Sequence, residues 1–545
     1  MQRKKFNGMQ MATAMILFLL VLACNGKNKV EEAPDESPDQ EQEQEQEQEE
    51  QPLDFAAIQA AYDTYGFVLD TAGHPLEGVV VSDGFSSSRT GKEGIYWFNR
   101  HANAYYVHYS VPENCRVPVD KTTGLPAFFQ QLKSATKRYD FILKPMEHGV
   151  ETTFTLVCIA DPQVKTVANT NRFKNETVVD VRQHLSGIDG PKYGVVLGDI
   201  IFDVPSLFPD IRSAMHVNKT GVPLFQAIGN HDHLFGAANE IESQRNFERQ
   251  LGPLNYSFNR GNAHIVVMDN VLHLLGSAST YNAGFTAEQF TWLQNDLSFV
   301  SKDKLLLFCV HIPFKIGSVS GGSTVNRNAY YTEVLNLLAE FQEAHIMVGH
   351  THDNSNYIHT VKGKQIYEHV HGTACGAWWN STIAKDGTPN GYAIYTVDGS
   401  TITNWYYKPT RYSKDFQIRL YRGTDVFTGG HASKSWQFIA HNAKQIIANV
   451  WNSDPDWVVK VYEDNTLTGV MSPYTDSDCW AVAYHVGNKG LSETTYDKAM
   501  DHFYHYTLTG NPQKVEIEAI DRFGNKYYQS AFCSPSAADY PDQYD

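Results

Sequence analysis

The chain has 545 residues, a formal net charge of -17 and 42% hydrophobic residues. Its basic residues form no stripe, so we expect no nucleic-acid partner. Residues 31–54 contain twelve Asp or Glu and no Lys or Arg, and without them the net charge is about -5. The seven cysteines include no C-x-x-C pair, which excludes a dense disulfide framework, although a bridge between Cys479 and Cys533 stays open.

The first residues are typical of a secretory signal. Three basic residues at positions 3–5 precede an apolar run from Met9 to Ala23, which is too short for a comfortable membrane span. The run ends in Val-Leu-Ala before Cys24, and this ending resembles a bacterial lipobox with Cys24 as the lipidated first residue. We therefore expect a lipoprotein signal peptide over residues 1–23, with a plain signal peptide and an incidental cysteine as the alternative.

An acidic segment follows directly. Residues 31–54 include a run in which Glu alternates with Gln and cannot build a core, so we expect residues 24–54 to be a disordered tether that holds the folded part off the membrane. The predicted location is exported and membrane-anchored, either periplasmic or at the cell surface. About 490 residues then remain, which is enough for three domains.

Short strands and turns fill residues 55–147. Apolar stretches at Gly66–Leu69, Val79–Ser82 and Gly94–Phe98 are separated by Gly, Pro and Asp, a spacing that predicts a small β-sandwich. Its expected role is that of an accessory spacer.

Residues 148–408 contain five short, nearly continuous apolar runs, as strands covered on both faces require. The runs are Phe154–Ala160, Tyr193–Leu197, Pro223–Ile228, Leu305–Val310 and Ala344–Val348. A polar cluster follows each: Asp161-Pro162-Gln163, Gly198-Asp199, Gly229-Asn230-His231-Asp232, His311 before Pro313, and Gly349-His350-Thr351-His352. Chemistry in α/β sheets lies beyond the carboxyl ends of strands, so the clusters can converge on one crevice.

The residue types in these clusters suit a binuclear site. Carboxylates and imidazoles without thiolates fit Mn, Fe or Zn. A carboxylate such as Asp199 can bridge two ions about 3.5–4 Å apart, which lets both clamp the oxygens of an in-line displacement. No Ser-His-Asp or Cys-His arrangement competes with this interpretation.

In their order, the clusters resemble the pattern of the calcineurin-like metallophosphoesterases, which is D-x-H, G-D, G-N-H-E/D, a lone His, and G-H-x-H. The resemblance implies an α/β fold, a β-sandwich flanked by helices, over roughly residues 148–408. It also implies that His231 stabilises or protonates the leaving oxygen while Asp232 orients its ring. The metal ligands that it implies are Asp161 and His352 for the first ion, Asp199 as the bridge, and Asn230, His311 and His350 for the second.

One position departs from the family pattern. Gln163 stands where the family usually has His, and an amide oxygen is a weaker ligand than imidazole for a transition metal. Some family members share the D-P-Q form, so Gln163 remains a candidate ligand. Asp203 could act behind the metal ligands or be a solvated loop carboxylate. Five other histidines are expected to be surface or packed residues and not ligands: His233, His264, His273, His369 and His371.

Substrate contacts are expected from two loops. The stretch Lys315–Asn328 is rich in Gly and Ser and contains Arg327, so it could be a flap that brings a cation to a phosphate, or an ordinary loop. The ring of Trp378 could line the substrate pocket, or it could only pack against neighbouring side chains. Arg327 and Trp378 are therefore candidate substrate-binding residues.

Residues 409–545 contain further β-rich stretches at Trp457–Tyr462, Trp480–Tyr484 and Val515–Ile520, with a helix expected around Ser433–Asn449. The flanking segments resemble the N-terminal immunoglobulin-like and C-terminal β-rich domains found with this phosphoesterase family.

The sequence thus predicts an exported enzyme in which two divalent metal ions activate water for in-line attack on a small phosphate monoester or diester, with a membrane contact through a lipid at Cys24. Two alternatives stay open. One is an inactive phospho-ligand-binding lipoprotein, which the Gln163 change favours. The other is a surface adhesion protein that binds through its β-domains.

Overall fold

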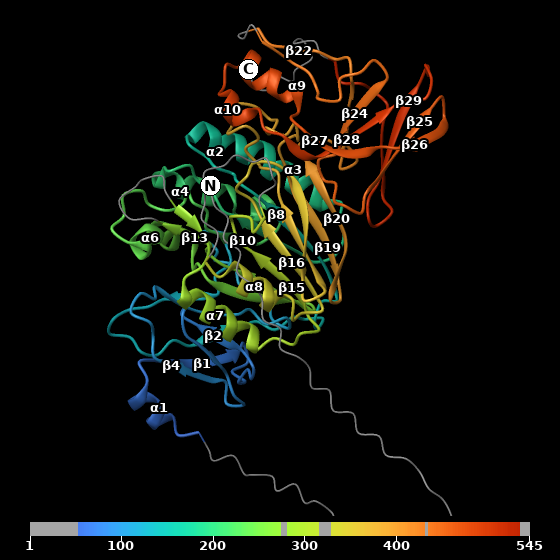
Figure 1. The fold of residues 1–545 in the computed structure, drawn as a ribbon. Helices are drawn as coiled ribbons and strands as arrows, with labels where there is room; N and C mark the ends of the chain where they lie inside the picture. The colour runs from blue at the N-terminus through green and yellow to red at the C-terminus, as the bar shows by residue number, and fades with distance from the viewer. Residues whose placement is uncertain (1–52, 274–280, 316–328, 431–433, 535–545) are drawn as a thin grey trace, which may run out of the picture. The chain divides into compact units, whose positions relative to one another are not determined.

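The computed structural model describes residues 53–273, 281–315, 329–430 and 434–534. The N-terminal part begins with α1 (Phe55–Ala61) and forms two small sheets, as predicted (Figure 1). One sheet has the order β4-β1-β7 and the other β3-β2-β5-β6. Their strands are β1 (Thr64–Asp70), β2 (Val80–Ser82), β3 (Ser87–Arg89), β4 (Ile95–Phe98), β5 (Tyr106–Tyr109), β6 (Phe129–Gln131) and β7 (Phe141–Leu143).

Two larger sheets form the central part. The first has the order β10-β9-β8-β19-β20, with β8 (Thr153–Ile159), β9 (Lys192–Leu197), β10 (Leu224–Ala227), β19 (Gly391–Asp398) and β20 (Thr401–Pro409). The second has the order β11-β12-β15-β16-β18-β17, with β11 (Tyr256–Arg260), β12 (Ala263–Val267), β15 (Leu305–Cys309), β16 (Glu343–Val348), β17 (Ser355–Val361) and β18 (Lys364–Val370). The five predicted core strands are thereby confirmed.

The alternation of side chains along these strands explains the layers. In β8, Leu156 and Cys158 face a core shared with residues of the second sheet, whereas Val157 and Ile159 face helices. Helices on that outer side include α2 (Val167–Phe173), α3 (Val179–Ser186), α4 (Phe208–Ala214) and α6 (Glu240–Leu251), with a π-helical turn η1 (Lys174–Val178) and short η2 (Pro205–Leu207) and α5 (Val217–Thr220). The second sheet is covered by α7 (Ala287–Ser298) and α8 (Tyr331–Leu338), beside the hairpin β13 (Val271–His273) and β14 (Tyr281–Ala283). Both faces of the inner strands are buried, which is why these strands are nearly continuously apolar.

The C-terminal part holds two four-stranded sheets, β21-β24-β28-β27 and β26-β25-β29-β30. Their strands are β21 (Arg419–Arg422), β24 (Gln445–Asn449), β25 (Val458–Glu463), β26 (Thr466–Val470), β27 (Ser472–Asp476), β28 (Met500–Thr507), β29 (Val515–Ile520) and β30 (Lys526–Gln529). A short antiparallel pair is formed by β22 (Phe427–Thr428) and β23 (Ser435–Trp436). The remaining elements are α9 (Cys479–Val482), a π-helical turn η3 (Ala483–Asn488) and α10 (Glu493–Tyr496).

Two expectations for this part are wrong. The helix expected over residues 433–449 is replaced by β23 and β24, because Ile446 and Ile447 face two different cores, as a strand covered on both sides requires. The strand expected over residues 480–484 is helical, because the side chain of Asp478 accepts a hydrogen bond from the backbone N–H of Ala481 and caps α9. The question left open for Cys479 and Cys533 is answered too, because the two are not joined by a disulfide.

The segment that joins β18 to β19 enters the core of the C-terminal part. Ile383 packs in one cluster with Tyr421 and Phe503. The side chain of Asn449, on β24, donates a hydrogen bond of 2.7 Å to the carbonyl oxygen of Asp386. The chain therefore leaves the central sheet, contributes to the C-terminal core, and returns to the central sheet as β19.

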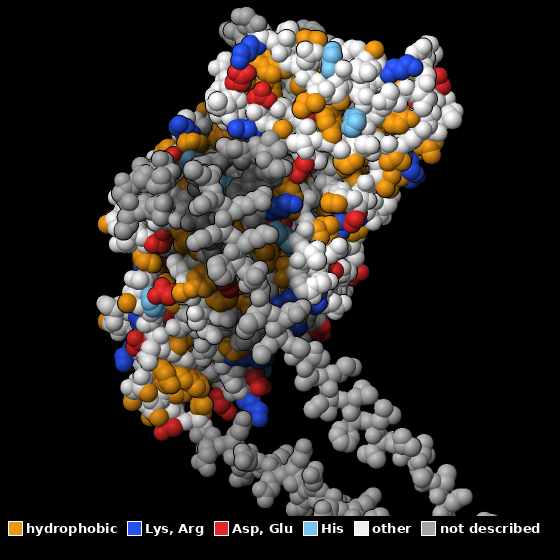
Figure 2. Space-filling view, viewed as in Figure 1, with side chains coloured by type: hydrophobic (Ala, Val, Ile, Leu, Met, Phe, Trp, Pro, Cys, Tyr) orange, Lys and Arg blue, Asp and Glu red, His pale blue; other side chains and the backbone are white. Residues whose placement is uncertain are grey.

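Among the described residues, no helix is long and apolar enough to cross a membrane. The face in Figure 2 shows Lys and Arg scattered among Asp and Glu. The predicted signal peptide and Cys24, most of the tether, and Arg327 with most of its loop lie outside the described residues.

Candidate metal centre

The five polar clusters lie at the carboxyl ends of parallel neighbours. In the first sheet β8, β9 and β10 run parallel, and Asp161, Asp199 and Asn230 follow them. In the second sheet β15 and β16 run parallel, and His311 and His350 follow them. Two facing sheets thus direct their clusters into one site, as the sequence predicts.

The backbone of this site is unusual. Five of the candidate metal ligands adopt left-handed conformations although none is glycine: Asp161 (φ 46°), Gln163 (φ 41°), Asp199 (φ 48°), His350 (φ 74°) and His352 (φ 59°). Such conformations cost about 1–3 kcal/mol each and persist where the surrounding structure enforces them. They gather at functional sites in proteins, which makes this concentration of strain an independent pointer to the same residues.

Glycines allow the clusters to approach one another. A Cβ on Gly229 would collide with the backbone N and the carboxylate of Asp199. A Cβ on Gly349 would collide with the carboxylate of Asp161. The loops after the strands can therefore touch only because these two positions lack side chains.

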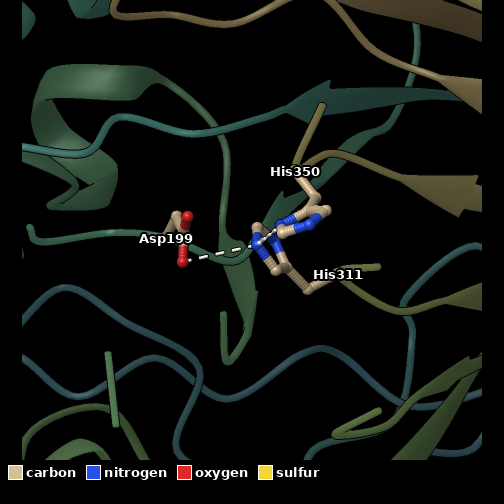
Figure 3. A group of neighbouring side chains, drawn as sticks. All are labelled: Asp199, His311 and His350. Atoms are coloured by element: carbon tan, nitrogen blue, oxygen red, sulfur yellow. Dashed lines mark hydrogen bonds and ion pairs between the residues drawn. The ribbon is translucent and has the colours of Figure 1, made fainter. Parts of the chain in front are cut away.

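Asp199, His311 and His350 form one half of the site (Figure 3). Nε2 of His311 lies 3.3 Å from Oδ1 of Asp199 and 3.2 Å from Nδ1 of His350. Oδ1 of Asn230 lies 3.1 Å from that same Nε2 and 3.0 Å from Nδ1 of His350. Four potential ligand atoms from four loops thus converge.

The hydrogen bonds around His311 determine which of its ring atoms is an acceptor. Its Nδ1 donates to the carbonyl oxygen of Leu197 at 2.8 Å, so in the neutral ring Nε2 carries the lone pair. That lone pair points at a carboxylate and an amide oxygen. Burial lowers the pKa of His311, but the Asp199 carboxylate outweighs burial and raises this pKa to about 9. The surroundings of Nε2 therefore favour a positive charge, which a proton supplies without a metal and which a metal cation would supply in its place.

Asp161, Asp199 and His352 form the other half. Nε2 of His352 lies 3.4 Å from Oδ1 of Asp161, and the backbone N–H of His350 donates to the same carboxylate. Gln163 lies beside them, where its Nε2 donates to Oδ2 of Asp199 at 3.0 Å. Its Oε1 is buried and has no hydrogen-bond partner, so this amide oxygen has lone pairs available to coordinate a metal ion.

His231 lies at the edge of the site with its Nδ1 2.6 Å from Oδ1 of Asp203. Burial lowers the pKa of His231, but the carboxylates of Asp199 and Asp203 outweigh burial and raise it overall. The ring stacks on Phe202 at a centroid distance of 4.2 Å. Nδ1 is thus held by a carboxylate, which leaves Nε2 as the atom that can give a proton.

The role expected for Asp232 is wrong. Its carboxylate accepts hydrogen bonds from the backbone N–H groups of Ile200, Ile201 and Gly229, and Asp203 takes the ring of His231 instead. Asp232 is fully buried, so it ties the loop after β9 to the loop after β10. This geometry fits the interpretation in which Asp203 binds no metal itself and orients a neighbouring side chain of the site.

Comparisons with known proteins found two family models that match segments on either side of the ligand clusters. Residues 63–146 match the family model described as the N terminal of calcineurin-like phosphoesterase, and residues 368–527 match the model described as its C terminal. The chain belongs to the calcineurin-like phosphoesterase family. The comparison with curated proteins gave no match.

Solved structures similar to this calcineurin-like phosphoesterase include purple acid phosphatase PPD1 from yellow lupin, at 14% identity and a TM-score of 0.35, covering 61% of this chain and 66% of that one. A 5'-nucleotidase precursor from Thermus thermophilus has 14% identity and a TM-score of 0.28, with coverages of 47% and 55%. Phosphopantetheinyl hydrolase from Mycobacterium tuberculosis has 12% identity and a TM-score of 0.27, with coverages of 41% and 91%. At scores this low, activity and substrate have to be argued from the site itself.

Three residues of this calcineurin-like phosphoesterase contact the site although the sequence did not predict a role for them or left two roles open. Sγ of Cys375 lies 3.7 Å from Nδ1 of His352 and so contacts the ring on the side away from Asp161. Phe202 stacks on His231, and the Asp203 carboxylate holds that ring. No local pattern marks Cys375 or Phe202. The spacing of Asp203 four residues after Asp199 is the one available signal.

The candidate Trp378 lies beside the site, where its ring stacks on His352 at 4.2 Å. Its role toward a substrate stays a prediction. Of the histidines expected to be packed, His264 pairs with Asp296 at 2.9 Å and Nε2 of His371 contacts the hydroxyl of Tyr395 at 2.8 Å. His233 forms a separate group with Glu240 and Asp269 whose spacing could hold a metal ion.

Proposed function

We propose that this chain is a metal-dependent phosphoesterase that hydrolyses a phosphate monoester or diester at a binuclear centre. The observation that carries the proposal is the convergence of lone-pair atoms from His311, Asn230, Asp199 and His350 beside the buried, unpartnered Oε1 of Gln163. Such a set of buried acceptors is costly unless a cation satisfies it.

The residues divide between two ions. Asn230, His311 and His350 would hold one, Asp161, His352 and Gln163 the other, and Asp199 would contact both. Carboxylate, imidazole and amide donors suit Mn, Fe or Zn. When bound, two divalent ions supply Lewis acidity, which lowers the pKa of water toward neutrality and offsets the charge of the phosphoryl oxygens.

The chain's own residues supply the rest of the chemistry. Asp203 holds Nδ1 of His231, so Nε2 is free to donate a proton to the departing ester oxygen. The carboxylates of Asp199 and Asp203 raise the pKa of His231, which favours the protonated ring that this role requires. The enforced backbone of the ligand loops fixes the donors before substrate arrives, so little free energy is lost in ordering them.

The test uses the chain from Phe55 onward, which forms one compact unit. We expect metal-dependent hydrolysis of an aryl phosphate monoester or diester with Mn, Fe or Zn, and its loss in the double variant Asn230→Ala, His350→Ala. Metal content measured by mass spectrometry should fall in the same variant. A folded wild-type chain that binds metal yet turns over neither ester would refute the enzyme and favour the phospho-ligand-binding lipoprotein.

We also propose that the protein is exported and anchored through a lipid on Cys24. The support is the sequence alone: the basic start, the short apolar run and the acidic spacer after it. Metabolic labelling with a radioactive fatty acid should mark the wild type and not Cys24→Ser. Equal labelling of the two would refute the anchor.

A further inference from the structure

A pocket of about 440 Å³ opens directly beside the metal centre. Gln163 forms part of its wall, so the pocket is continuous with the ligand loops. Its other lining residues include Phe202 and Trp378, and Thr495 and Tyr496 from α10 of the C-terminal part. The central and C-terminal parts of the chain therefore both contribute to the pocket wall.

The two aromatic residues connect the pocket to the chemistry. Phe202 stacks on His231 with centroids 4.2 Å apart and planes 22° apart. Trp378 stacks on His352 with centroids 4.2 Å apart and planes 20° apart. The pocket wall thus includes one ring that packs on the expected proton donor and one that packs on a candidate metal ligand. A substrate with its phosphorus at the metals and its ester oxygen at His231 would place its leaving group here.

Trp378 is held firmly in place. It is half-buried and adopts a left-handed conformation (φ 49°). The next residue is fixed twice, because Nε1 of Trp379 donates to the carbonyl oxygen of Pro162 at 2.9 Å and Arg172 donates to the carbonyl oxygen of Trp379 at 2.7 Å. The ring of Tyr496 meets Trp378 edge-on at 5.7 Å. A preformed aromatic surface loses little entropy when a flat ring packs on it.

The described lining of the pocket carries a single positive charge. Of the residues that line it, Lys165 is the charged one, with its Nζ 4.7 Å from the centroid of the Phe202 ring. No carboxylate is part of the lining among the described residues. A flat apolar surface with an ammonium group at its edge suits an anionic molecule that carries an aromatic ring.

We infer that this pocket is a leaving-group subsite that selects phosphoesters whose alcohol carries a flat aromatic ring, and that the C-terminal part supplies its outer wall. This inference rests on the proposed function and names the substrate class for the same site. Tyr496 and Thr495 are then specificity residues, and Lys165 attracts a further negative charge on the leaving group.

The test compares two substrates in one variant of the full chain. Thr495 is half-exposed and lines the pocket, so Thr495→Trp fills it without replacing a metal ligand. The matched control is Thr494→Trp, because Thr494 is exposed on the same short helix and does not line the pocket. The readout is the ratio of kcat/KM for naphthyl phosphate to kcat/KM for glycerol phosphate, which cancels any general loss of metal or stability.

We expect Thr495→Trp to lower that ratio at least about tenfold, chiefly through KM of the naphthyl ester, because stacking on an aromatic wall contributes a factor of this size. Thr494→Trp should leave the ratio unchanged. Lys165→Gln should lower the preference for naphthyl esters with an added carboxylate over plain ones.

An unchanged ratio in Thr495→Trp, with both esters still hydrolysed, would overturn the subsite and leave the proposed function standing. A drop seen for glucose 1-phosphate but not for naphthyl phosphate would overturn the aromatic assignment in favour of a sugar ring. Absence of turnover with every ester in the metal-loaded wild type is a different result, because it would refute the proposed function itself.

Discussion

Replacing Asp203 by Asn removes the charge that holds His231 and keeps the size of the side chain. The contact joins Nδ1 of His231 to Oδ1 of Asp203 at 2.6 Å, with the two side chains 22% and 23% exposed. A hydrogen bond between charged partners contributes about 1.5–3 kcal/mol, and partial exposure favours the lower end. We therefore expect kcat/KM to fall about 10–30-fold with an ester whose leaving oxygen needs a proton.

The assay separates this role from a general one by changing the leaving group. A nitrophenyl ester departs as a stable anion and needs little proton donation, so Asp203→Asn should lower its kcat/KM much less than that of an alkyl ester. Asp189→Asn is the matched control, since Asp189 is an exposed aspartate. A double variant with His231→Asn should be no worse than His231→Asn alone, because the two residues act as a unit.

Two outcomes would refute this reasoning. An equal loss with both esters would mean that Asp203 acts through the metals or the fold and not through proton donation. Additive losses in the double variant would mean that the two residues act independently. Asp232→Asn offers a contrast, because its carboxylate joins two ligand loops and its loss should lower activity on both esters alike.

Three further outcomes follow from the geometry. Gln163→His should tighten retention of one of the two metal ions about tenfold against a chelator, because imidazole is the stronger ligand, and unchanged retention would exclude Gln163 as a ligand. Gly229→Ala should lose about 1–3 kcal/mol of stability in a denaturant titration through collision with Asp199, whereas Gly91→Ala, with open space around it, should lose none. Burial lowers the pKa of His485 from 6.5 to about 3, so the unfolded chain binds the proton more tightly and stability falls as pH drops below 6.5. Between pH 7 and pH 5 the wild type should lose about 2 kcal/mol more of its free energy of unfolding than His485→Gln, and equal losses would contradict the assignment.

The sequence predicted the central strands and the polar clusters because both signals are local. A strand buried on both faces has to be continuously apolar, and the turn after it has to carry the ligands, so each run and its cluster can be recognised without the rest of the fold. The left-handed conformations of Asp161 and His352 were not visible in this way, since the neighbouring loops impose them.

The partner of His231 could not be chosen from the sequence. Asp232 is adjacent in the chain, but the backbone N–H groups of another loop occupy its carboxylate. Asp203 lies 28 residues before His231 and reaches it only because β9 and β10 are parallel neighbours. A similar non-local effect made β24 a strand, because cores on both of its sides bury Ile446 and Ile447.

The path of the chain between β18 and β19 limits how this protein can be divided. Ile383 belongs to the core of the C-terminal part, although β19 and β20 after it complete the sheet that contains β8. Ending the chain at residue 409 would therefore leave Ile383 and the carbonyl oxygen of Asp386 exposed in what remained. A chimera of two relatives would therefore have to take the segment between β18 and β19 and the C-terminal part from the same parent. The central part and the C-terminal part are then constrained to evolve as one unit.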